Sequence, residues 1–321
     1  ADLERALDVY QQAVALTPAD NPDRPGYLNN WGNALSDRFK RLGSLADLEK
    51  ALELYQQAID LTPADSPKRP MYLNNWGNAL SDRFKRLGSL ADLEKALEVH
   101  QQAVALTPEG SPDRPMYLNN WGIALCERYE RLGSLDDLDA ALDLFQQAVA
   151  LTSEDSPKRP MYLNNWGNAL SDRYARLGSL VDLERALEVH QQAVDLTPEG
   201  SPDRPGYLSN WGNAIRERYA RLGSLADLEK ALEVYQQAVA LTPEDNPDRP
   251  RYLNNWGNAL YQRYARLGSL ADLERALELH QQAVALTPQN HPDRILYSEN
   301  LGHTYYQAQE YSHARQAFAD M

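Results

Sequence analysis

Tyr27-Leu28-Asn29-Asn30-Trp31-Gly32 is the stretch that decides the fold, because it returns almost unchanged every 45 residues. Copies begin at Tyr72, Tyr117, Tyr162, Tyr207 and Tyr252, and a degraded copy begins at Tyr297. A fixed period of about 20–50 residues is typical of a stacked repeat array, in which each unit contacts mainly its neighbours. Such an array presents an extended surface, so the sequence predicts a binding scaffold.

Residues 24–68 show what one repeat contains. From residue 25 to residue 42 the apolar side chains recur at steps of three and four, which predicts a helix with one buried face. Gly43 is typical of the left-handed position that ends a helix, and Ser44 is a suitable N-cap for the next one. A second helix then extends to about residue 61, where a proline stops it. Each repeat is therefore expected to be two antiparallel helices and a proline-containing connector.

Repetition of this unit sets the expected domain organisation. Residues 1–321 are expected to form a single array that opens with a half-repeat at residues 1–23 and closes with a divergent capping helix pair at residues 292–321. The first residues match the middle of a repeat and no initiator Met is present, so we expect a piece of a longer protein. Between the ends we expect six helix pairs, at residues 24–68, 69–113, 114–158, 159–203, 204–248 and 249–291.

Composition and charge limit the classes of partner. The net charge of −14 and the pI near 4.9 argue against nucleic acid and against anionic membranes, since both attract clustered Lys and Arg. Arg38 and Arg41 recur in each repeat, so the acidic balance favours a basic ligand only weakly. No stretch approaches the roughly 18 apolar residues of a membrane span, and the only cysteine, Cys126, cannot form an intrachain disulfide. We therefore expect a cytoplasmic protein.

All tryptophans of the chain occupy one position of the repeat. The stripe has two interpretations, a ladder on which ligand groups stack or a part of the core. We favour the core, because each buried aromatic ring removes about 150–250 Å² from water. The six residues are Trp31, Trp76, Trp121, Trp166, Trp211 and Trp256.

Five positions of the repeat resemble the tetratricopeptide repeat (TPR) family. The family pattern has a small residue in the first helix, an aromatic residue flanked by alanines in the second, and then a proline. Gly32, Ala51, Tyr55, Ala58 and Pro63 fill these positions, and the resemblance covers essentially the whole chain. It implies an all-α fold, a TPR-like α-solenoid in which antiparallel helix pairs form a right-handed superhelix. The repeat departs from the family in length, since it has 45 residues where about 34 are usual.

Asparagines along the first helix of each repeat are the candidate binding residues. TPR arrays usually line their concave face with this helix, so the resemblance places the asparagines there. An asparagine side chain offers both donor and acceptor groups, and a ladder of them suits the backbone of an extended peptide. The alternative is that they only bridge neighbouring helices. The candidates are Asn29, Asn30, Asn33, Asn74, Asn75, Asn78, Asn119, Asn120, Asn164, Asn165, Asn168, Asn210, Asn213, Asn254, Asn255 and Asn258.

Differences between the copies mark candidate specificity residues beside this ladder. Near-identical repeats copy useful and idle residues alike, so the positions that vary along the first helix are more informative. In one interpretation, the residues at these positions determine which partner is bound. In the other, they are solvated positions at which substitutions have accumulated by drift. The residues are Ile123 and His303, at the position of Asn33, and Cys126, Arg216, Tyr261 and Tyr306, at the position of Ser36.

The sequence contains no recognisable catalytic, cofactor-binding or metal-binding motif. Phosphate-binding, nucleophile-elbow, zinc-protease and paired-cysteine patterns are all missing. His100, His190 and His280 recur in alternate repeats at the position of Tyr55, where we expect packing residues rather than metal ligands. We therefore expect no enzyme activity and no cofactor.

These observations favour a scaffold that binds a protein or an extended peptide. Two alternatives remain open from the sequence. One is a structural spacer or a rod with weak self-association. The other is the regulatory arm of a protease or NTPase domain outside the sequence, because the repeats resemble elongated TPR arrays of CHAT-type proteases and NTPase sensors.

Overall fold

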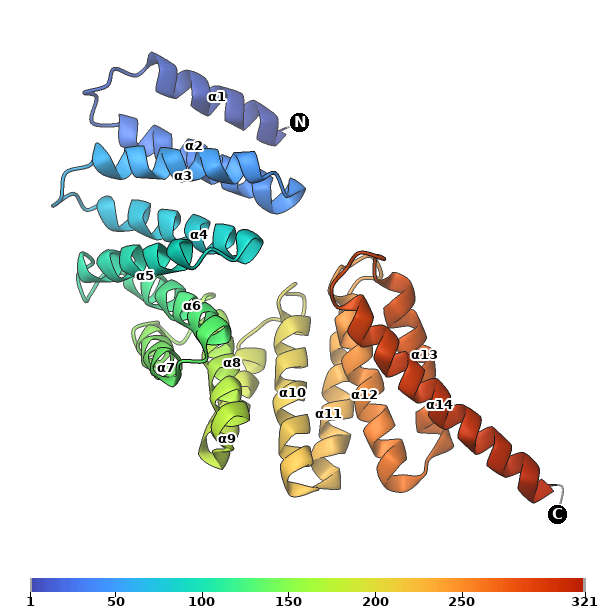
Figure 1. The fold of residues 1–321 in the computed structure, drawn as a ribbon. Coiled ribbons are helices and arrows are strands. Elements are labelled where there is room, and N and C mark those ends of the chain that lie inside the picture. Colours follow the sequence, from blue (N-terminus) through green and yellow to red (C-terminus); the bar gives the residue numbers. More distant parts are fainter. Residues whose placement is uncertain (1, 320–321) are drawn as a thin grey trace. The chain divides into compact units, whose positions relative to one another are not determined.

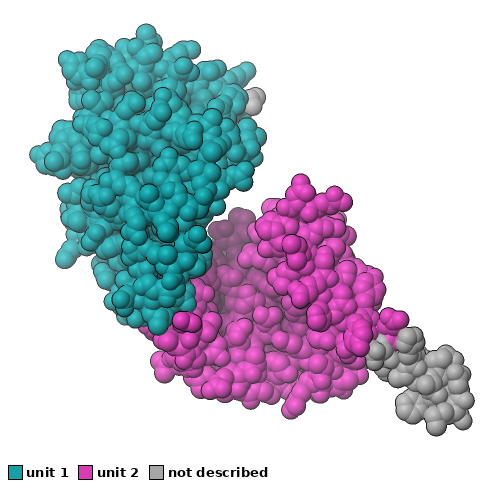
Figure 2. Space-filling view, in the orientation of Figure 1, with its two compact units in different colours: residues 1–156 teal, residues 157–321 magenta. Residues whose placement is uncertain are grey.

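The computed structural model describes residues 2–319, with side chains described for residues 2–309, and every regular element within them is an α-helix. The helices fall into two compact units, Ala1–Ser156 and Pro157–Met321 (Figures 1 and 2). Unit 1 contains α1 (Asp2–Leu16), α2 (Arg24–Leu42), α3 (Leu45–Asp60), α4 (Arg69–Leu87), α5 (Leu90–Ala105), α6 (Arg114–Leu132) and α7 (Leu135–Ala150). Unit 2 contains α8 (Arg159–Leu177), α9 (Leu180–Asp195), α10 (Arg204–Leu222), α11 (Leu225–Ala240), α12 (Arg249–Leu267), α13 (Leu270–Leu286) and α14 (Arg294–Ala319).

Two kinds of helix alternate along each unit. We call the even-numbered helices A helices and the odd-numbered ones B helices. Each A helix from α2 to α12 packs against the B helix that follows it, and within a unit successive A helices also touch. The all-α solenoid of paired helices predicted from the sequence is confirmed.

The turn inside each pair is fixed by a glycine and an ion pair. Gly43 has φ 71°, a left-handed conformation that suits glycine, and its N–H donates to the Phe39 carbonyl at 2.7 Å. Across this turn, Arg38 donates from both Nε and Nη2 to the buried Asp47 carboxylate, at 2.8 and 2.6 Å. The same two-point pair recurs in the other complete pairs as Arg83–Asp92, Arg128–Asp137, Arg173–Asp182, Arg218–Asp227 and Arg263–Asp272.

The connector between pairs is held by an arginine. The last carbonyls of a helix have no partner within it, and Arg69 supplies one by donating from Nη1 to the carbonyls of Ile59 (2.9 Å) and Thr62 (2.7 Å). The Thr62 hydroxyl also donates to the Ala58 carbonyl. The same capping is made by Arg24 and Arg114 in unit 1 and by Arg204, Arg249 and Arg294 in unit 2.

A ring from each B helix packs directly on a glycine of its A helix. A Cβ built on Gly32 would lie 2.8 Å from the ring of Tyr55, and one on Gly77 would lie 2.6 Å from the ring of His100. Both rings are buried, so a larger residue has no room there. Alanines equivalent to Ala51 and Ala58, which are fully buried, keep the backbones close along the core.

The tryptophans contribute to the edge of this core. Trp166 is buried and the others are half-buried. A cation from the following B helix lies over the ring in four repeats, which adds a cation–π interaction to the packing. The pairs are Lys95 on Trp76, Arg185 on Trp166, Lys230 on Trp211 and Arg275 on Trp256, at 4.7–5.7 Å from the ring centroid.

The last predicted helix pair takes another form. A single helix, α14, occupies Arg294–Ala319, where the sequence predicts two helices within residues 292–321; residues 320–321 lie outside the described chain. The physical reason is in the sequence, because this segment contains neither the Leu-Gly-Ser turn of the other repeats nor a proline after Pro292. Nothing therefore interrupts the helix.

Candidate functional site

A polar groove lies between two neighbouring A helices of unit 1. It has a volume of about 320 Å³ and is lined from α2 by Asn33, Ser36, Asp37 and Lys40, from α4 by Asn75, Asn78, Ala79 and Asp82, and from α3 by Tyr55. Three of the predicted groove asparagines therefore come together here. The Lys40 ammonium lies 3.7 Å from the Asp82 carboxylate, so one cation and one anion face each other across the groove.

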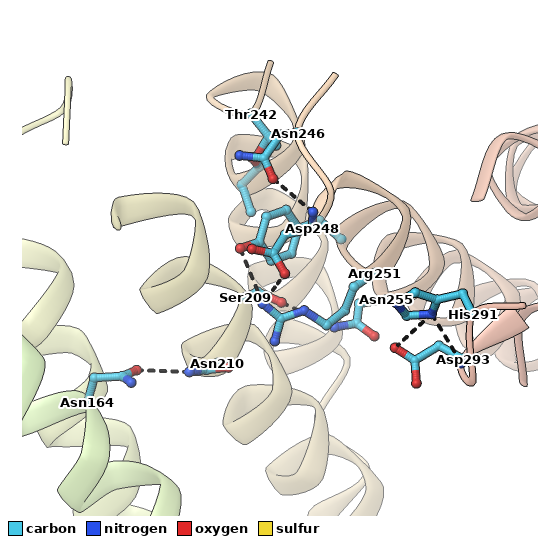
Figure 3. A network of polar contacts seen from close by, with 12 residues as sticks. Asn164, Ser209, Asn210, Thr242, Asn246, Asp248, Arg251, Asn255, His291 and Asp293 are labelled. Carbon is cyan, nitrogen blue, oxygen red and sulfur yellow. Dashed lines mark hydrogen bonds and ion pairs between the residues drawn. The ribbon is translucent and has the colours of Figure 1, made fainter. Parts of the chain in front are cut away.

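Hydrogen bonds between asparagines join neighbouring A helices within each unit, and we call each such bond a rung. In unit 1, Asn75 donates from Nδ2 to Asn29 Oδ1 at 3.0 Å, and Asn120 donates likewise to Asn74 at 2.9 Å. In unit 2 the corresponding bonds join Asn210 to Asn164 at 2.9 Å, Asn255 to Ser209 Oγ at 3.1 Å and Asn300 to Asn254 at 2.9 Å (Figure 3 shows the first two).

The two asparagine positions of each rung differ in exposure. The first position, equivalent to Asn29, is buried in these copies: Asn29, Asn74, Asn119, Asn164 and Asn254, with Ser209 in the one copy that differs. The second position, equivalent to Asn30, is exposed at Asn30 and half-buried in the other copies: Asn75, Asn120, Asn165, Asn210 and Asn255. The helix-bridging role that the sequence left open is therefore part of the structure.

The third asparagine position contacts the packed ring of the B helix. The Tyr55 hydroxyl donates to Asn33 Oδ1 at 2.8 Å, and the Tyr235 hydroxyl donates to Asn213 Oδ1 at 2.7 Å. In the repeat at residues 114–158 both partners change together, because Phe145 lacks the hydroxyl and Ile123 lacks the amide. Ile123 is thus matched to the ring beneath it.

The three remaining rings are histidines, and they lie in the core as expected. Burial lowers the pKa of His100 and His190 to about 4, and that of His280 also to about 4. The Nδ1 atoms of His100 and His190 have no hydrogen-bond partner, whereas His280 Nδ1 lies 2.9 Å from the Thr304 hydroxyl. No hydrogen bond joins these rings to Asn78, Asn168 or Asn258 among the described residues.

The candidate specificity residues have different environments. Cys126 is half-buried, and the Arg216 guanidinium lies 3.9 Å from the Glu217 carboxylate. Tyr261 is half-buried with its ring centroid 6.2 Å from that of Tyr264. His303 and Tyr306 are exposed on α14, where they line a shallow hollow with Glu299, Gly302 and Gln307.

Charge on the A helices differs between the units. In unit 1, Lys40 faces Asp82 and Lys85 pairs with Glu127 at 2.8 Å, so cation–anion pairs join successive A helices. In unit 2 the equivalent lysine positions hold alanines: Ala175, Ala220 and Ala265.

Sequence reasoning missed a second polar site, at the connectors of unit 2. Its cavity of about 320 Å³ is lined by residues that include Asp248, Arg251, His291, Asp293 and Tyr297 (Figure 3 labels the first four). Arg251 Nη2 lies 3.4 Å from Asp248 Oδ1, and His291 Nδ1 lies 3.9 Å from Asp293 Oδ2. Arginine at this position was the available signal, because the other copies hold Gly26, Met71, Met116, Met161 and Gly206.

Two features are missing from the described residues. No group of three or more His, Cys, Asp or Glu side chains there is placed to hold a metal ion. Within the same residues, no helix is both long and apolar enough to cross a bilayer.

Comparisons with known proteins agree with the repeat architecture. A family model described as Tetratricopeptide repeat matches residues 26–67, 71–113 and 251–293. Among solved structures, an assembly chaperone of RpL4 is 15% identical with a TM-score of 0.57, over 89% of this chain and 99% of that one. BtubC from P. vanneervenii is 18% identical with a TM-score of 0.52, over 77% and 95%.

A third solved structure carries the same kind of near-copy repeats. This Podosopora anserina protein with nearly identical TPR-like repeats is 18% identical with a TM-score of 0.50, over 69% of this chain and 96% of that one. At these identities the likeness concerns the fold alone. A sequence comparison with curated proteins found no match.

Proposed function

We propose that this chain, a tetratricopeptide repeat protein, is a non-covalent scaffold that binds an extended segment of another protein along its A helices. The observation that carries the proposal is the groove between α2 and α4, where polar side chains of two successive A helices line one hollow. Side-chain amides and charges arranged in this way suit a polypeptide backbone with polar side chains.

The pattern of variation supports recognition over a purely structural role. The contacts that hold the pairs together are the same throughout, as the Arg38–Asp47 pair shows. The groove side of the A helices varies instead, with Ser36, Arg216 and Tyr261 at one position. Variation along the groove side of helices whose turns are held by a constant ion pair favours a surface that selects its partner.

The proposal also covers catalysis, location and partner selection. The scaffold acts without a catalytic group or cofactor of its own, and it works in the cytoplasm, as the single cysteine suggests. Tyr261, Tyr306, Arg216, Cys126, Ile123 and His303 adjust which segment is bound. Such a scaffold could serve as the recognition arm of a larger enzyme.

The proposal is tested with peptides selected from an unbiased display library of 15-residue sequences against the whole chain. A groove variant, Asp37→Ala with Tyr261→Ser and Tyr306→Ser, changes exposed or half-buried A-helix residues only. A matched control, Gln57→Ala with Gln102→Ala and Gln237→Ala, changes exposed B-helix residues. We expect at least about a tenfold loss of affinity in the groove variant alone, since a few residues carry most binding energy. Equal affinity of both variants would reject the A-helix groove.

A further inference from the structure

One donor and one acceptor are left over for a ligand in the groove between α2 and α4. Asn33 Oδ1 accepts the single Tyr55 hydroxyl hydrogen at 2.8 Å, while Ser36 Oγ lies 3.2 Å from the Tyr55 hydroxyl oxygen and donates to it. The group that remains to Asn33 is its NH₂, a donor. Tyr55 is fixed in turn, because its buried ring packs on Gly32.

Asn75, on the opposite side of the same groove, uses its NH₂ group within the protein, whereas Asn33 uses its oxygen. Its NH₂ group donates to the buried Asn29 Oδ1 at 3.0 Å. Its own Oδ1 accepts no hydrogen bond in the part of the chain that the structure describes, so the group left to a ligand is an acceptor. Asn33 and Asn75 line one hollow of about 320 Å³.

A donor beside an acceptor is the complement of a peptide unit, which carries one C=O and one N–H. Resting on the function proposed above, the geometry points to a peptide-unit site at this junction. Asn33 donates to a ligand carbonyl, Asn75 accepts from a ligand N–H, and Tyr55 is the positioning residue that sets the Asn33 amide.

The same arrangement occurs once in unit 2, between α10 and α12. The Tyr235 hydroxyl donates to Asn213 Oδ1 at 2.7 Å, and Asn255 donates from Nδ2 to Ser209 Oγ at 3.1 Å. Asn213 is thereby left with a donor and Asn255 with an acceptor. The second site repeats these two hydrogen bonds, although Arg216 replaces Ser36 and Ala220 replaces Lys40.

Among the described residues, repeats without a tyrosine at this B-helix position lack the hydrogen bond from the ring to the asparagine. Where the B-helix ring is His100, His190 or His280, no bond from the ring fixes the neighbouring asparagine within the described residues, so its amide can turn either way. Where the ring is Phe145, the asparagine is replaced by Ile123 and no amide remains at that position. The identity of the buried ring therefore determines between which successive A helices a peptide backbone can be bound.

The charged residues beside the two sites differ. Lys40 and Asp82 face each other beside the first site, whereas Arg216 and Glu217 pair beside the second, and Ala220 replaces the lysine. The common feature is a neutral pair of amides. Binding of the ligand backbone at these sites is thus independent of the ligand's side chains. The charged neighbouring residues determine which ligand sequences are preferred.

The test uses a fluorescein-labelled peptide selected against the whole chain and a series of its analogues, each with one backbone amide replaced by an ester. An ester removes the N–H donor and weakens the carbonyl acceptor. The variant Tyr55→Phe with Tyr235→Phe keeps both packed rings, as Phe145 does naturally. Tyr10→Phe is the matched control, because Tyr10 has the same repeat position in α1 and its hydroxyl makes no hydrogen bond to an asparagine among the described residues.

We expect the double variant to bind the peptide about three- to tenfold more weakly per site, the range of one neutral hydrogen bond. An ester removes the N–H that Asn75 accepts and weakens the carbonyl that Asn33 contacts. It should therefore weaken binding to the unchanged chain more than to the double variant, in which only the Asn75 bond remains to be lost. Tyr10→Phe should bind as the unchanged chain does.

Two results would overturn the inference. Equal affinity of the unchanged chain and the double variant, with the same ester penalties, would reject the tyrosine-set sites and leave the binding scaffold standing. A library that yields no binding peptide at all would reject both the sites and the proposed function.

Discussion

Arg38 and Asp47 form a two-point ion pair across the turn between α2 and α3, with Nε–Oδ2 at 2.8 Å and Nη2–Oδ1 at 2.6 Å. The hydrogen bonds from Arg38 lower the pKa of the Asp47 carboxyl, which is itself buried. Because the pair recurs at every A–B turn, the frame of the array is the same in all repeats, and ligand selectivity is free to vary on its surface.

Removing the arginine of one such pair should destabilise its repeat. Arg83→Ala leaves the buried Asp92 without its cation, and we expect a cost of about 2–3 kcal/mol, somewhat below that of a fully buried pair. Urea unfolding followed by circular dichroism measures the change in midpoint. Arg86→Ala, at an exposed position of the same helix, is the control; equal midpoints for the two variants would contradict the role of the pair.

Enlarging the glycine under a packed ring should be costly only where a ring is present. Gly77→Ala places a Cβ 2.6 Å from the His100 ring, and we expect a loss of about 1–3 kcal/mol from overpacking. Gly302 has the same repeat position on α14, with nothing within 4 Å of a Cβ there. Gly302→Ala should therefore be neutral or stabilising in thermal unfolding, since alanine favours helix. Matching losses in both variants would disprove ring packing as the cause.

Breaking a rung of the asparagine ladder should lower stability. Asn75→Ala leaves the buried Asn29 Oδ1 without its donor from α4, at an expected cost of about 1–2 kcal/mol. Asn30→Ala changes the same repeat position where the side chain is exposed, and should cost less. Denaturant midpoints compare the two; a larger loss at Asn30 would be inconsistent with a structural ladder.

Stability should fall as the solution becomes acidic because three buried histidines, His100, His190 and His280, have lowered pKa values. His100 and His190 have pKa values of about 4 in the folded chain, against about 6.5 when unfolded. Between these values the unfolded chain binds the additional protons, so the free energy of unfolding decreases as pH falls from about 6.5 to about 4 and then levels off. The loss approaches about 3 kcal/mol for each histidine.

The check is a series of urea midpoints between pH 7 and pH 4. His100→Phe with His190→Phe removes both groups and uses the ring that Phe145 supplies in another repeat. We expect this variant to lose about two thirds of the histidine-linked pH dependence above pH 4, because His280 remains. His303→Ala, at an exposed site, should keep the full dependence. An unchanged slope in the Phe variant would point to other groups.

The sequence alone gives the helix pairs, since Gly43, Ser44 and the apolar spacing depend only on local chemistry. The resemblance also identifies Gly32 and Tyr55 as a matched small and aromatic residue, and the structure adds that they touch. The continuous α14 was within reach of the sequence as well, because the turn residues that end the other A helices are missing there.

The asparagines show where sequence reasoning stops. Repetition identifies Asn29, Asn30 and Asn33 equally, because each recurs with the same period. Only the three-dimensional arrangement separates them, since Asn29 is buried, its partner Asn75 comes from the next A helix, and Asn33 meets a ring of the B helix. These contacts span 22 and 46 residues, so no local pattern reveals them.

The measurement that tests the account most directly is photo-crosslinking of a library-selected peptide, carrying a benzophenone at successive positions, to the whole chain. Mass spectrometry then identifies the crosslinked residues. The account predicts crosslinks on the A helices, concentrated between α2 and α4 and between α10 and α12. Crosslinks confined to the B helices or the connectors would contradict it.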